Sequence, residues 1–287
     1  MKNVAHSVRE RLLNRARETG LPHEYLLVRY ALERILYRLS VSAHAGRFLL
    51  KGALLFTVWG RDDHRPTRDA DLLGSGPCEI EHLESAFRDI CTVACDDGII
   101  FNPDSVRGER IAEDKVYTGV RVLLEAELAK ARIRVQVDVG FGDAVTPGPE
   151  SAEYPSLLDF PAPKLRVYPV YTVVAEKLHA MVALALDNSR MKDFYDLWAI
   201  AQGFELDSAL LAKAIAATFE RRRTEIPGAI PVALTPAFAE SATRKRHWEG
   251  FVRRSRLPAD RVTFEQTQAA IAGLVLPALK LARIAPR

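Results

Sequence analysis

The sequence predicts an α+β fold, in which a small mixed, mostly antiparallel sheet flanked by helices is followed by a helical C-terminal part. Three observations favour this order. Residues 69–73 and the two arms of a hairpin at 115–140 alternate polar and apolar side chains, as half-buried strands do. Six prolines from residue 147 to residue 169 mark a crossing segment, and beyond them apolar residues recur at helical spacing. We therefore expect two domains, at residues 1–165 and 166–287.

The composition is that of a globular protein with a mildly basic charge. The chain has 287 residues, a formal net charge of +3 and a pI near 8.7, which permits a polyanionic partner without requiring one. The three cysteines, Cys78, Cys91 and Cys95, follow neither a disulfide nor a zinc-ligand pattern. The charged N-terminus lacks an apolar signal segment, and no run approaches the ~18 apolar residues of a membrane span. We therefore expect a soluble cytoplasmic protein without a membrane partner.

Two amphipathic helices are expected near the N-terminus, the second over residues 24–39. Arginines decorate both helices, and two interpretations stay open for them: a solvated helix face, or a surface that binds a phosphate backbone. The arginines concerned are Arg9, Arg11, Arg15, Arg17, Arg29, Arg34 and Arg38.

An apolar run at residues 48–58 is predicted to be a buried helix. Lys51 and Gly52 lie near its start, where free backbone N–H groups can meet a phosphate. A polar turn at residues 61–66 separates this run from the next strand.

The strand after the turn contains the sequence Asp69-Ala70-Asp71. Because side chains alternate along a strand, Asp69 and Asp71 point to one face while Ala70 and Leu72 face a core. Paired carboxylates repel each other unless a cation neutralises them, and Mg²⁺ is the usual cation where phosphates are the substrate. An isolated pair of this kind can also be a surface turn or a solvated strand edge.

A helix over residues 80–90 and a short strand over residues 99–102 are expected before the hairpin, which offers a third carboxylate. Alternate residues of its second arm, residues 131–140, are apolar, and Asp138 lies on the opposite, polar face. Asp138 can join the aspartate pair if the two strands are neighbours. Two glycines close the arm, Gly140 and Gly142, and they indicate an unusual backbone conformation or the close approach of a ligand.

The C-terminal part begins with a helix over residues 172–186 that carries Lys177 within its apolar stripe. Its ammonium either reaches water from the stripe edge or is partly buried and aimed at phosphates. A second helix follows, with an ionic cluster that is either a set of surface pairs or a site. The cluster consists of Arg190, Lys192, Asp193 and Asp196.

Further helices are expected at residues 207–223, 239–256 and 263–281. Between Arg244 and Arg254 basic and aromatic residues alternate, which is typical either of a plain amphipathic helix or of a nucleic-acid surface.

Six short motifs follow one another in a fixed order between residues 48 and 198. They are Lys51-Gly52-Ala53, Thr67-Arg68-Asp69-Ala70-Asp71-Leu72, Val137-Asp138-Val139-Gly140-Phe141-Gly142-Asp143, Tyr168-Pro169, Val174-Ala175-Glu176-Lys177-Leu178 and Arg190-Met191-Lys192-Asp193-Phe194-Tyr195-Asp196-Leu197. In this order the motifs resemble those of the AbiEii/MenT-like nucleotidyltransferase toxins, members of the DNA polymerase β-like nucleotidyltransferase superfamily. The resemblance implies a polymerase β-like nucleotidyltransferase core followed by a helical domain that completes the active-site cleft.

This resemblance implies a Mg²⁺-dependent enzyme that transfers NMP from an NTP to an acceptor hydroxyl and releases pyrophosphate. Asp69 and Asp71 would hold Mg²⁺ against the triphosphate. Asp138 would join a second metal ion and help to deprotonate the hydroxyl. Lys177 would neutralise phosphate charge, as would Lys51 or the backbone beside it.

The family pattern assigns further residues to the nucleotide. Gly52 would lie at the phosphates, and Thr67 occupies the Ser/Thr position of this toxin family, so it would contact the triphosphate. Asp193 is a further active-site acid in that pattern, and Arg190 a phosphate or acceptor contact, whereas Asp196 is expected to be structural. Ala53 departs from the Gly-Ser or Gly-Gly of the superfamily.

The resemblance also implies the partners: an NTP donor, an RNA acceptor that is the 3′ end of tRNA, whose blockage would stop translation, and a cognate antitoxin. Two other functions stay open. A small-molecule nucleotidyltransferase that modifies antibiotics would use the same metal site, and a catalytically inactive nucleic-acid or protein-binding module would bind neither Mg²⁺ nor NTP. For the enzyme we expect five side chains to line one cavity, namely Asp69, Asp71, Asp138, Lys177 and Asp193.

Overall fold

The structure, a computed structural model, describes residues 4–61, 64–112, 118–257 and 262–284. Its chain divides into two compact units. The sheet unit comprises residues 1–142 and 150–167, and the helical unit comprises residues 143–149 and 168–287. The domains expected at residues 1–165 and 166–287 stay a prediction, because compactness does not show that each part folds by itself.

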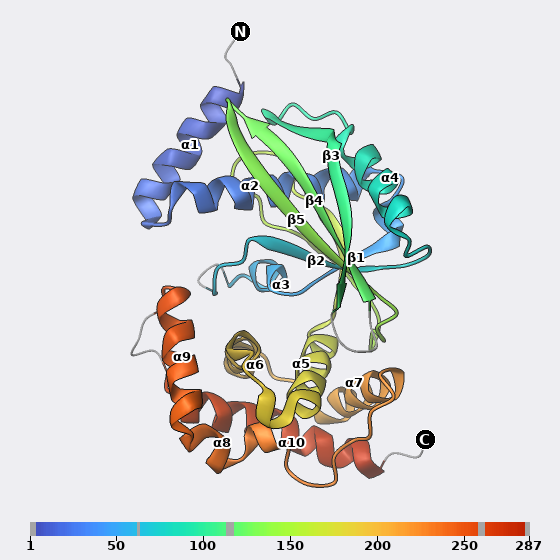
Figure 1. The fold of residues 1–287 in the computed structure, drawn as a ribbon, viewed down its shortest axis with the longest axis vertical. Coiled ribbons are helices and arrows are strands. Elements are labelled where there is room, and N and C mark those ends of the chain that lie inside the picture. The colour runs from blue at the N-terminus through green and yellow to red at the C-terminus, as the bar shows by residue number, and fades with distance from the viewer. Residues whose placement is uncertain (1–3, 62–63, 113–117, 258–261, 285–287) are drawn as a thin grey trace. The chain divides into compact units, whose positions relative to one another are not determined.

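The sheet unit is built on one mixed sheet of seven strands in the order β3-β4-β5-β2-β1-β7-β6 (Figure 1). The pairs β2–β5 and β1–β7 are parallel and the other four pairs are antiparallel, which confirms the predicted α+β class. The strands are β1 (Phe48–Lys51), β2 (Asp69–Gly74), β3 (Ile99–Ala112), β4 (Thr118–Leu128), β5 (Ala131–Phe141), β6 (Glu150–Glu153) and β7 (Lys164–Val167).

Helices cover this sheet. Helix α2 contacts β5 and β7, α4 contacts β3 and β4, and α1 contacts α2 and β4. Their apolar stripes are buried, which confirms the predicted amphipathic helices. The helices of the unit are α1 (Val4–Thr19), α2 (His23–Val41), α3 (Leu54–Val58) and α4 (Ile80–Cys91).

The predicted hairpin is formed by β4 and β5, although residues 115–117 of its predicted first arm lie outside the described residues. Ala129 and Lys130 have φ values of 47° and 67°, as a two-residue type I′ turn requires. In β5 the alternate apolar side chains are buried, whereas Arg132 and Arg134 are exposed. The period-2 pattern therefore predicted the faces of this strand correctly.

The prediction of a helix over residues 48–58 was wrong. The first part is strand β1, and the short helix α3 follows after a turn at Gly52, whose φ is +73°. All four residues of β1 are buried, because the strand lies between β2 and β7. A short continuous apolar run fits a central strand and a buried helix equally well, so the pattern could not distinguish them.

Three strands were predicted too short or not at all. Strand β3 continues from Ile99 to Ala112 through an irregular register between Asn102 and Arg107, whereas the sequence predicted a strand only over 99–102. Strands β6 and β7 lie inside the proline-rich segment and directly follow Pro149 and Pro163. Proline is allowed at strand starts, where its missing N–H costs no ladder hydrogen bond. In the predicted polar turn, Asp62 and Asp63 lie outside the described residues.

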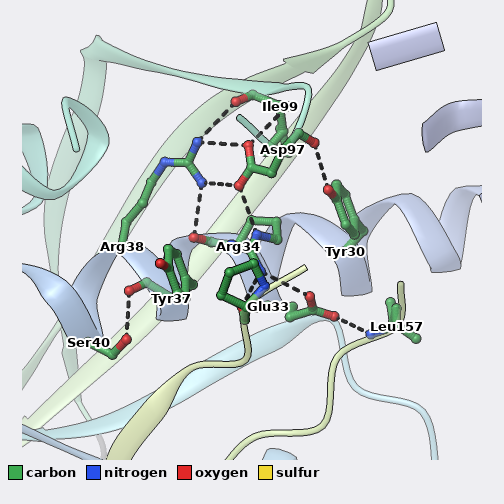
Figure 2. Close-up of polar contacts among 10 residues, drawn as sticks. Tyr30, Glu33, Arg34, Tyr37, Arg38, Ser40, Asp97, Ile99 and Leu157 are labelled. Atoms are coloured by element: carbon green, nitrogen blue, oxygen red, sulfur yellow. Dashed lines mark hydrogen bonds and ion pairs between the residues drawn. The ribbon is translucent and has the colours of Figure 1, made fainter. Parts of the chain in front are cut away.

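Two arginines of α2 are buried around one carboxylate (Figure 2). Arg34 donates from Nε to Asp97 Oδ2 at 2.8 Å, and Arg38 donates to both carboxylate oxygens at 2.7 and 3.0 Å. The Tyr30 hydroxyl donates to the Asp97 carbonyl at 2.7 Å. These side chains are at most 3% exposed. Both interpretations of Arg34 and Arg38, a solvated face and a phosphate surface, were therefore wrong.

Glu33 extends the same network toward the loop before β7 (Figure 2). Its Oε2 accepts the Leu157 backbone N–H at 2.7 Å, while Arg34 donates to the Pro161 carbonyl at 2.8 Å. Burial raises the pKa of Glu33, which the Leu157 N–H and the Arg34 charge only partly oppose. The network thus fastens the loop of residues 154–163 to α2.

The arginines of α1 have other roles. Arg9 and Arg15 donate to the carbonyl oxygens of Ala129 and Leu157, at 3.1 and 3.2 Å. Arg17 is exposed, as expected for a solvated face.

The helical unit packs around a group of aromatic rings. Phe264 is the centre of this group, with ring centroids 5.1 Å from Phe194 and 5.4 Å from Trp248. Trp248 and Phe251 are buried, so the aromatic residues of the basic segment belong to the core, as in a plain amphipathic helix. The helices are α5 (Val170–Leu184), α6 (Met191–Gly203), α7 (Ser208–Arg221), α8 (Pro236–Glu240), α9 (Ala242–Arg254) and α10 (Phe264–Ile284).

Of the described helices, α10 has the length and apolar composition that would suffice to cross a membrane. Core helices of soluble proteins pass the same test, and α10 packs against α6 and α7.

We expect Asp97→Asn to destabilise the protein by about 3–5 kcal/mol, because it leaves two buried guanidinium groups without their shared counterion. The free energy of unfolding in urea is the measurement. Asp96→Asn is the matched control, since Asp96 is exposed, and should change that free energy by less than about 0.5 kcal/mol. Equal stability of the two variants would contradict a structural role for the Asp97 charge.

Candidate active site

Strand β2 places two of the predicted carboxylates on one face. Ala70 and Leu72 are 0% and 1% exposed, whereas Asp69 and Asp71 are half-buried, as the alternation predicts. Strand β5 is the parallel neighbour of β2, and Asp71 is the register partner of Asp138. Register partners in adjacent strands project to the same side of a sheet. The strand of Asp138 is therefore the neighbour of the strand that carries the aspartate pair, as a third carboxylate at this site requires.

On its other side β2 pairs with β1, which brings Lys51 opposite Asp71. Gly52 follows with a φ of +73°, and a Cβ added there would lie 1.9 Å from Asp71 Oδ2. The carboxylate thus lies against the backbone at a point where only glycine leaves room. Thr67 donates from Oγ1 to Asp69 Oδ1 at 2.5 Å. Three further predicted site residues, Lys51, Gly52 and Thr67, thus lie around the aspartate pair.

Arg121 is a residue of this site that the sequence analysis missed. Its Nε and Nη2 donate to the two oxygens of Asp138 at 2.9 and 2.8 Å, and Gln136 Nε2 adds a contact at 3.2 Å. Strands β4 and β5 pair Arg121 directly with Asp138. The register of the predicted hairpin was the signal that could have identified this pair, because it follows from the position of the turn.

The oxygen ligands at this face fit the chemistry of Mg²⁺, which prefers carboxylates. However, among the described residues no group of three His, Cys, Asp or Glu side chains lies close enough to hold a metal ion. Asp138 is instead held by Arg121. Asp69 and Asp71 are therefore candidate cation ligands on this face, and the pairing of Asp138 with Arg121 would have to change for Asp138 to join them.

A second ionic cluster lies within the helical unit. Lys177 of α5 places its Nζ 2.7 Å from Asp193 Oδ1 and 2.8 Å from Asp196 Oδ2. Arg190 Nε lies 2.7 Å from the other oxygen of Asp193. The two aspartate side chains are 2% and 0% exposed and that of Lys177 is 14% exposed. The interpretations as surface pairs and as a lysine that reaches water were therefore wrong.

The charges of this cluster set the protonation of Asp193. Burial alone would raise the pKa of Asp193, but the charges of Lys177 and Arg190 hold that pKa below its usual range. Two cations and two carboxylates balance each other, so Asp193 stays ionised although it is buried.

A third group of polar contacts, within the helical unit, holds the segment that follows β5. Gly142 has a φ of +81°, which confirms the unusual backbone expected there. Arg222 donates to Asp143 Oδ1 at 3.0 Å and lies 3.2 Å from His179 Nδ1. Asp143 thus has a structural partner in a residue that no motif indicated.

The predicted site residues fall into both compact units. Lys51, Gly52, Thr67 and the three aspartates of β2 and β5 belong to the sheet unit, whereas the residues around Lys177 belong to the helical unit. That five of these side chains line one cavity stays a prediction.

We expect Lys177→Met to destabilise the protein by about 3–5 kcal/mol near pH 7, because it removes the cation that two buried carboxylates share and leaves Arg190 to pair with Asp193 alone. The loss should depend on pH. The depressed pKa of Asp193 contributes stability that is present above its unfolded pKa of about 4 and is lost as the pH falls through the folded pKa. The difference between variant and wild type should therefore narrow toward about pH 3.

Urea denaturation at several pH values measures this difference. The exposed Lys192→Met is the control, with an expected change below about 0.5 kcal/mol at each pH. A difference between Lys177→Met and wild type that stays constant down to about pH 3 would contradict the role of the ion pairs.

The model of a known protein family matches most of the chain. The family described as "Nucleotidyl transferase AbiEii toxin, Type IV TA system" matches residues 34–270. No protein with a curated description matches this chain.

Two solved structures share the fold. A protein from H. pylori described as a candidate nucleotidyltransferase is 16% identical, with a TM-score of 0.52, over 93% of this chain and 100% of its own. JHP933 from Helicobacter pylori is 15% identical, with a TM-score of 0.53, over 92% of this chain and 94% of its own. At such low identity the likeness supports the fold alone, and the family match carries the assignment. The resemblance seen in the motifs is thus confirmed, and the chain belongs to the AbiEii family of nucleotidyltransferase toxins of type IV toxin–antitoxin systems.

Proposed function

We propose that this protein transfers NMP from an NTP to an acceptor hydroxyl at the 3′ end of tRNA, with release of pyrophosphate, and thereby blocks translation. One observation carries the proposal: the register of β2 and β5 places Asp71 beside Asp138, with Asp69 on the same face. Phosphoryl transfer depends mainly on positioning and on neutralised charge, which such a set of carboxylates provides together with a cation.

Asp69 and Asp71 would hold Mg²⁺, and Asp138 would become a third ligand once its pairing with Arg121 changes. When bound, Mg²⁺ would neutralise charge on the triphosphate. Thr67 orients Asp69 through its hydrogen bond, so this carboxylate is prepared before any ligand arrives.

Asp138 is the group that would accept the proton of the attacking hydroxyl. Arg121 donates to both of its oxygens, and Gln136 Nε2 lies 3.2 and 3.3 Å from the same two atoms. These contacts orient the carboxylate. Once the pairing with Arg121 changes, an oxygen lone pair of Asp138 would be available to take the proton.

The remaining predicted residues would act on the phosphates. Gly52 allows a close approach to the backbone beside Asp71, and Lys51 adds a positive charge there. In the helical unit, Lys177 and Arg190 would contact phosphate or acceptor while Asp193 holds both side chains in place.

The family assignment implies a cognate antitoxin and a nucleotide substrate. We propose a cytoplasmic location, where tRNA is available and where the three cysteines, which are free, would stay reduced.

The direct test is incubation of the protein with total tRNA, Mg²⁺ and each radiolabelled NTP in turn. We expect label in tRNA with at least one NTP, and we expect Asp69→Ala to lower the rate by more than about 100-fold, because it removes a proposed metal ligand. Asp96→Ala is the control and should keep the wild-type rate, since Asp96 is exposed and outside the site.

Two other results of this assay would contradict the proposal. Mg²⁺-dependent NTP binding without label in RNA would overturn the RNA acceptor and direct the search to small molecules or proteins. If neither NTP nor Mg²⁺ binds, the chain is not an enzyme of this kind.

A second prediction uses the contact between Gly52 and Asp71. Gly52→Ala should displace the carboxylate and lower the transfer rate by about 100-fold, since a shift of about 1 Å in a reacting group can cost that much. Gly60→Ala is the matched control. Its φ is +72°, so it has the same left-handed strain, but nothing lies within 4 Å of its added Cβ. Equal rates for the two variants would show that Asp71 does not act at this position.

A further inference from the structure

The helical unit has a concave basic surface of which the proposed steps use only Arg190. This cavity of about 510 Å³, called here the basic groove, lies between the start of α6 and residues 246–254 of α9. Arg190 and Lys192 line it from α6 and the residue before it, and Arg246, His247 and Arg254 line it from α9. Phe251, which is buried, forms part of its floor.

The charges of the basic groove are not balanced within it. None of the described residues that line the groove is acidic. Lys192, Arg246 and Arg254 are exposed, and within the described part of the chain Lys192 and Arg254 have no ion-pair partner. Arg246 makes only a 3.4 Å hydrogen bond to Thr243 there. Several unpaired cations in one concavity attract an extended anion more strongly than a single charge would.

The side chains of the groove favour phosphates over a lipid surface. A helix that binds a membrane presents large apolar side chains beside its cations, and none of the residues lining the groove is an exposed large hydrophobic residue. Flexible lysine and arginine side chains in a concave strip are typical of proteins that follow a nucleic-acid backbone.

Arg190 connects the groove to the ionic cluster of the same unit. Its guanidinium lines the groove and also pairs with Asp193, 2.7 Å away. A phosphate chain bound in the groove would therefore reach the residues around Lys177 within one side-chain length. This is the arrangement that an acceptor strand needs if its end is to be modified.

We propose that the basic groove binds the phosphodiester backbone of the acceptor RNA, an inference that rests on the proposed transfer to tRNA. Lys192, Arg246 and Arg254 are the phosphate contacts, and Arg190 is the contact nearest to the strand end.

The test measures binding directly, without NTP. Fluorescently labelled tRNA is titrated with the wild type and with the triple variant Lys192→Gln, Arg246→Gln, Arg254→Gln at several salt concentrations. We expect the variant to bind more than about tenfold more weakly and to reduce the slope of log Kd against log salt by about two to three, because each phosphate contact contributes about 0.7–0.9. The control is Lys213→Gln, Arg223→Gln, Lys280→Gln, which removes the same charge from exposed residues outside the groove.

The outcomes separate this inference from the proposed function. If tRNA is labelled by the wild type but the groove variant and the control bind tRNA alike, the groove inference is overturned and the transfer reaction stands. If the groove variant alone loses binding but no protein labels tRNA, the groove stands and the transfer reaction does not. Thermal melting checks that both triple variants are folded. We expect them to be folded because all six side chains are exposed.

Discussion

The parallel pairing of β2 with β5 is the constraint on which the candidate active site depends. It places Asp71 beside Asp138, an arrangement of like charges that is unfavourable without cations. The neighbouring strands supply them: β4 brings Arg121 onto Asp138, and β1 brings Lys51 opposite Asp71. Across the four central strands, two acidic residues therefore lie between two basic ones. Each carboxylate of this pair thus has a basic residue beside it on the neighbouring strand.

Two other ionic clusters, around Asp97 and around Lys177, balance their charges in different ways. Asp97 receives hydrogen bonds from Arg34 and Arg38 on both oxygens and is 1% exposed, so nothing further can reach it. Its partners anchor the sheet unit. Around Lys177 the balance is reversed, with one ammonium between two buried carboxylates. The Lys177 side chain is 14% exposed, and the two aspartates fix the position of its ammonium.

Local patterns predicted the parts of this protein whose partners are close in sequence. Alternation identified the faces of β2 and β5, and helical spacing identified the amphipathic helices. The parallel neighbours β2 and β5 are joined by a long crossover, so the contact between Asp71 and Asp138 could only be stated as a condition. The buried arginines were misjudged for the same reason. Arg38 donates to Asp97, which lies 59 residues further along the chain, and the spacing of residues within α2 does not indicate such a distant partner. Gly52 was identified by its motif, but its contact with Asp71 depends on the pairing of β1 with β2.

The carboxylates of β2 and β5 and the cluster around Lys177 differ in how readily a ligand can replace the residue that pairs with the carboxylates. Arg121 is 32% exposed, so water can solvate its guanidinium if a cation takes its place at Asp138. The partners of Lys177 are fully buried, and removing their cation would leave two carboxylates in a medium where an unpaired charge costs several kcal/mol. Exchange is therefore expected at the β-sheet carboxylates and not at the helical cluster. In the proposed reaction Asp138 is therefore the group whose pairing would change, whereas Lys177 would stay a fixed charge.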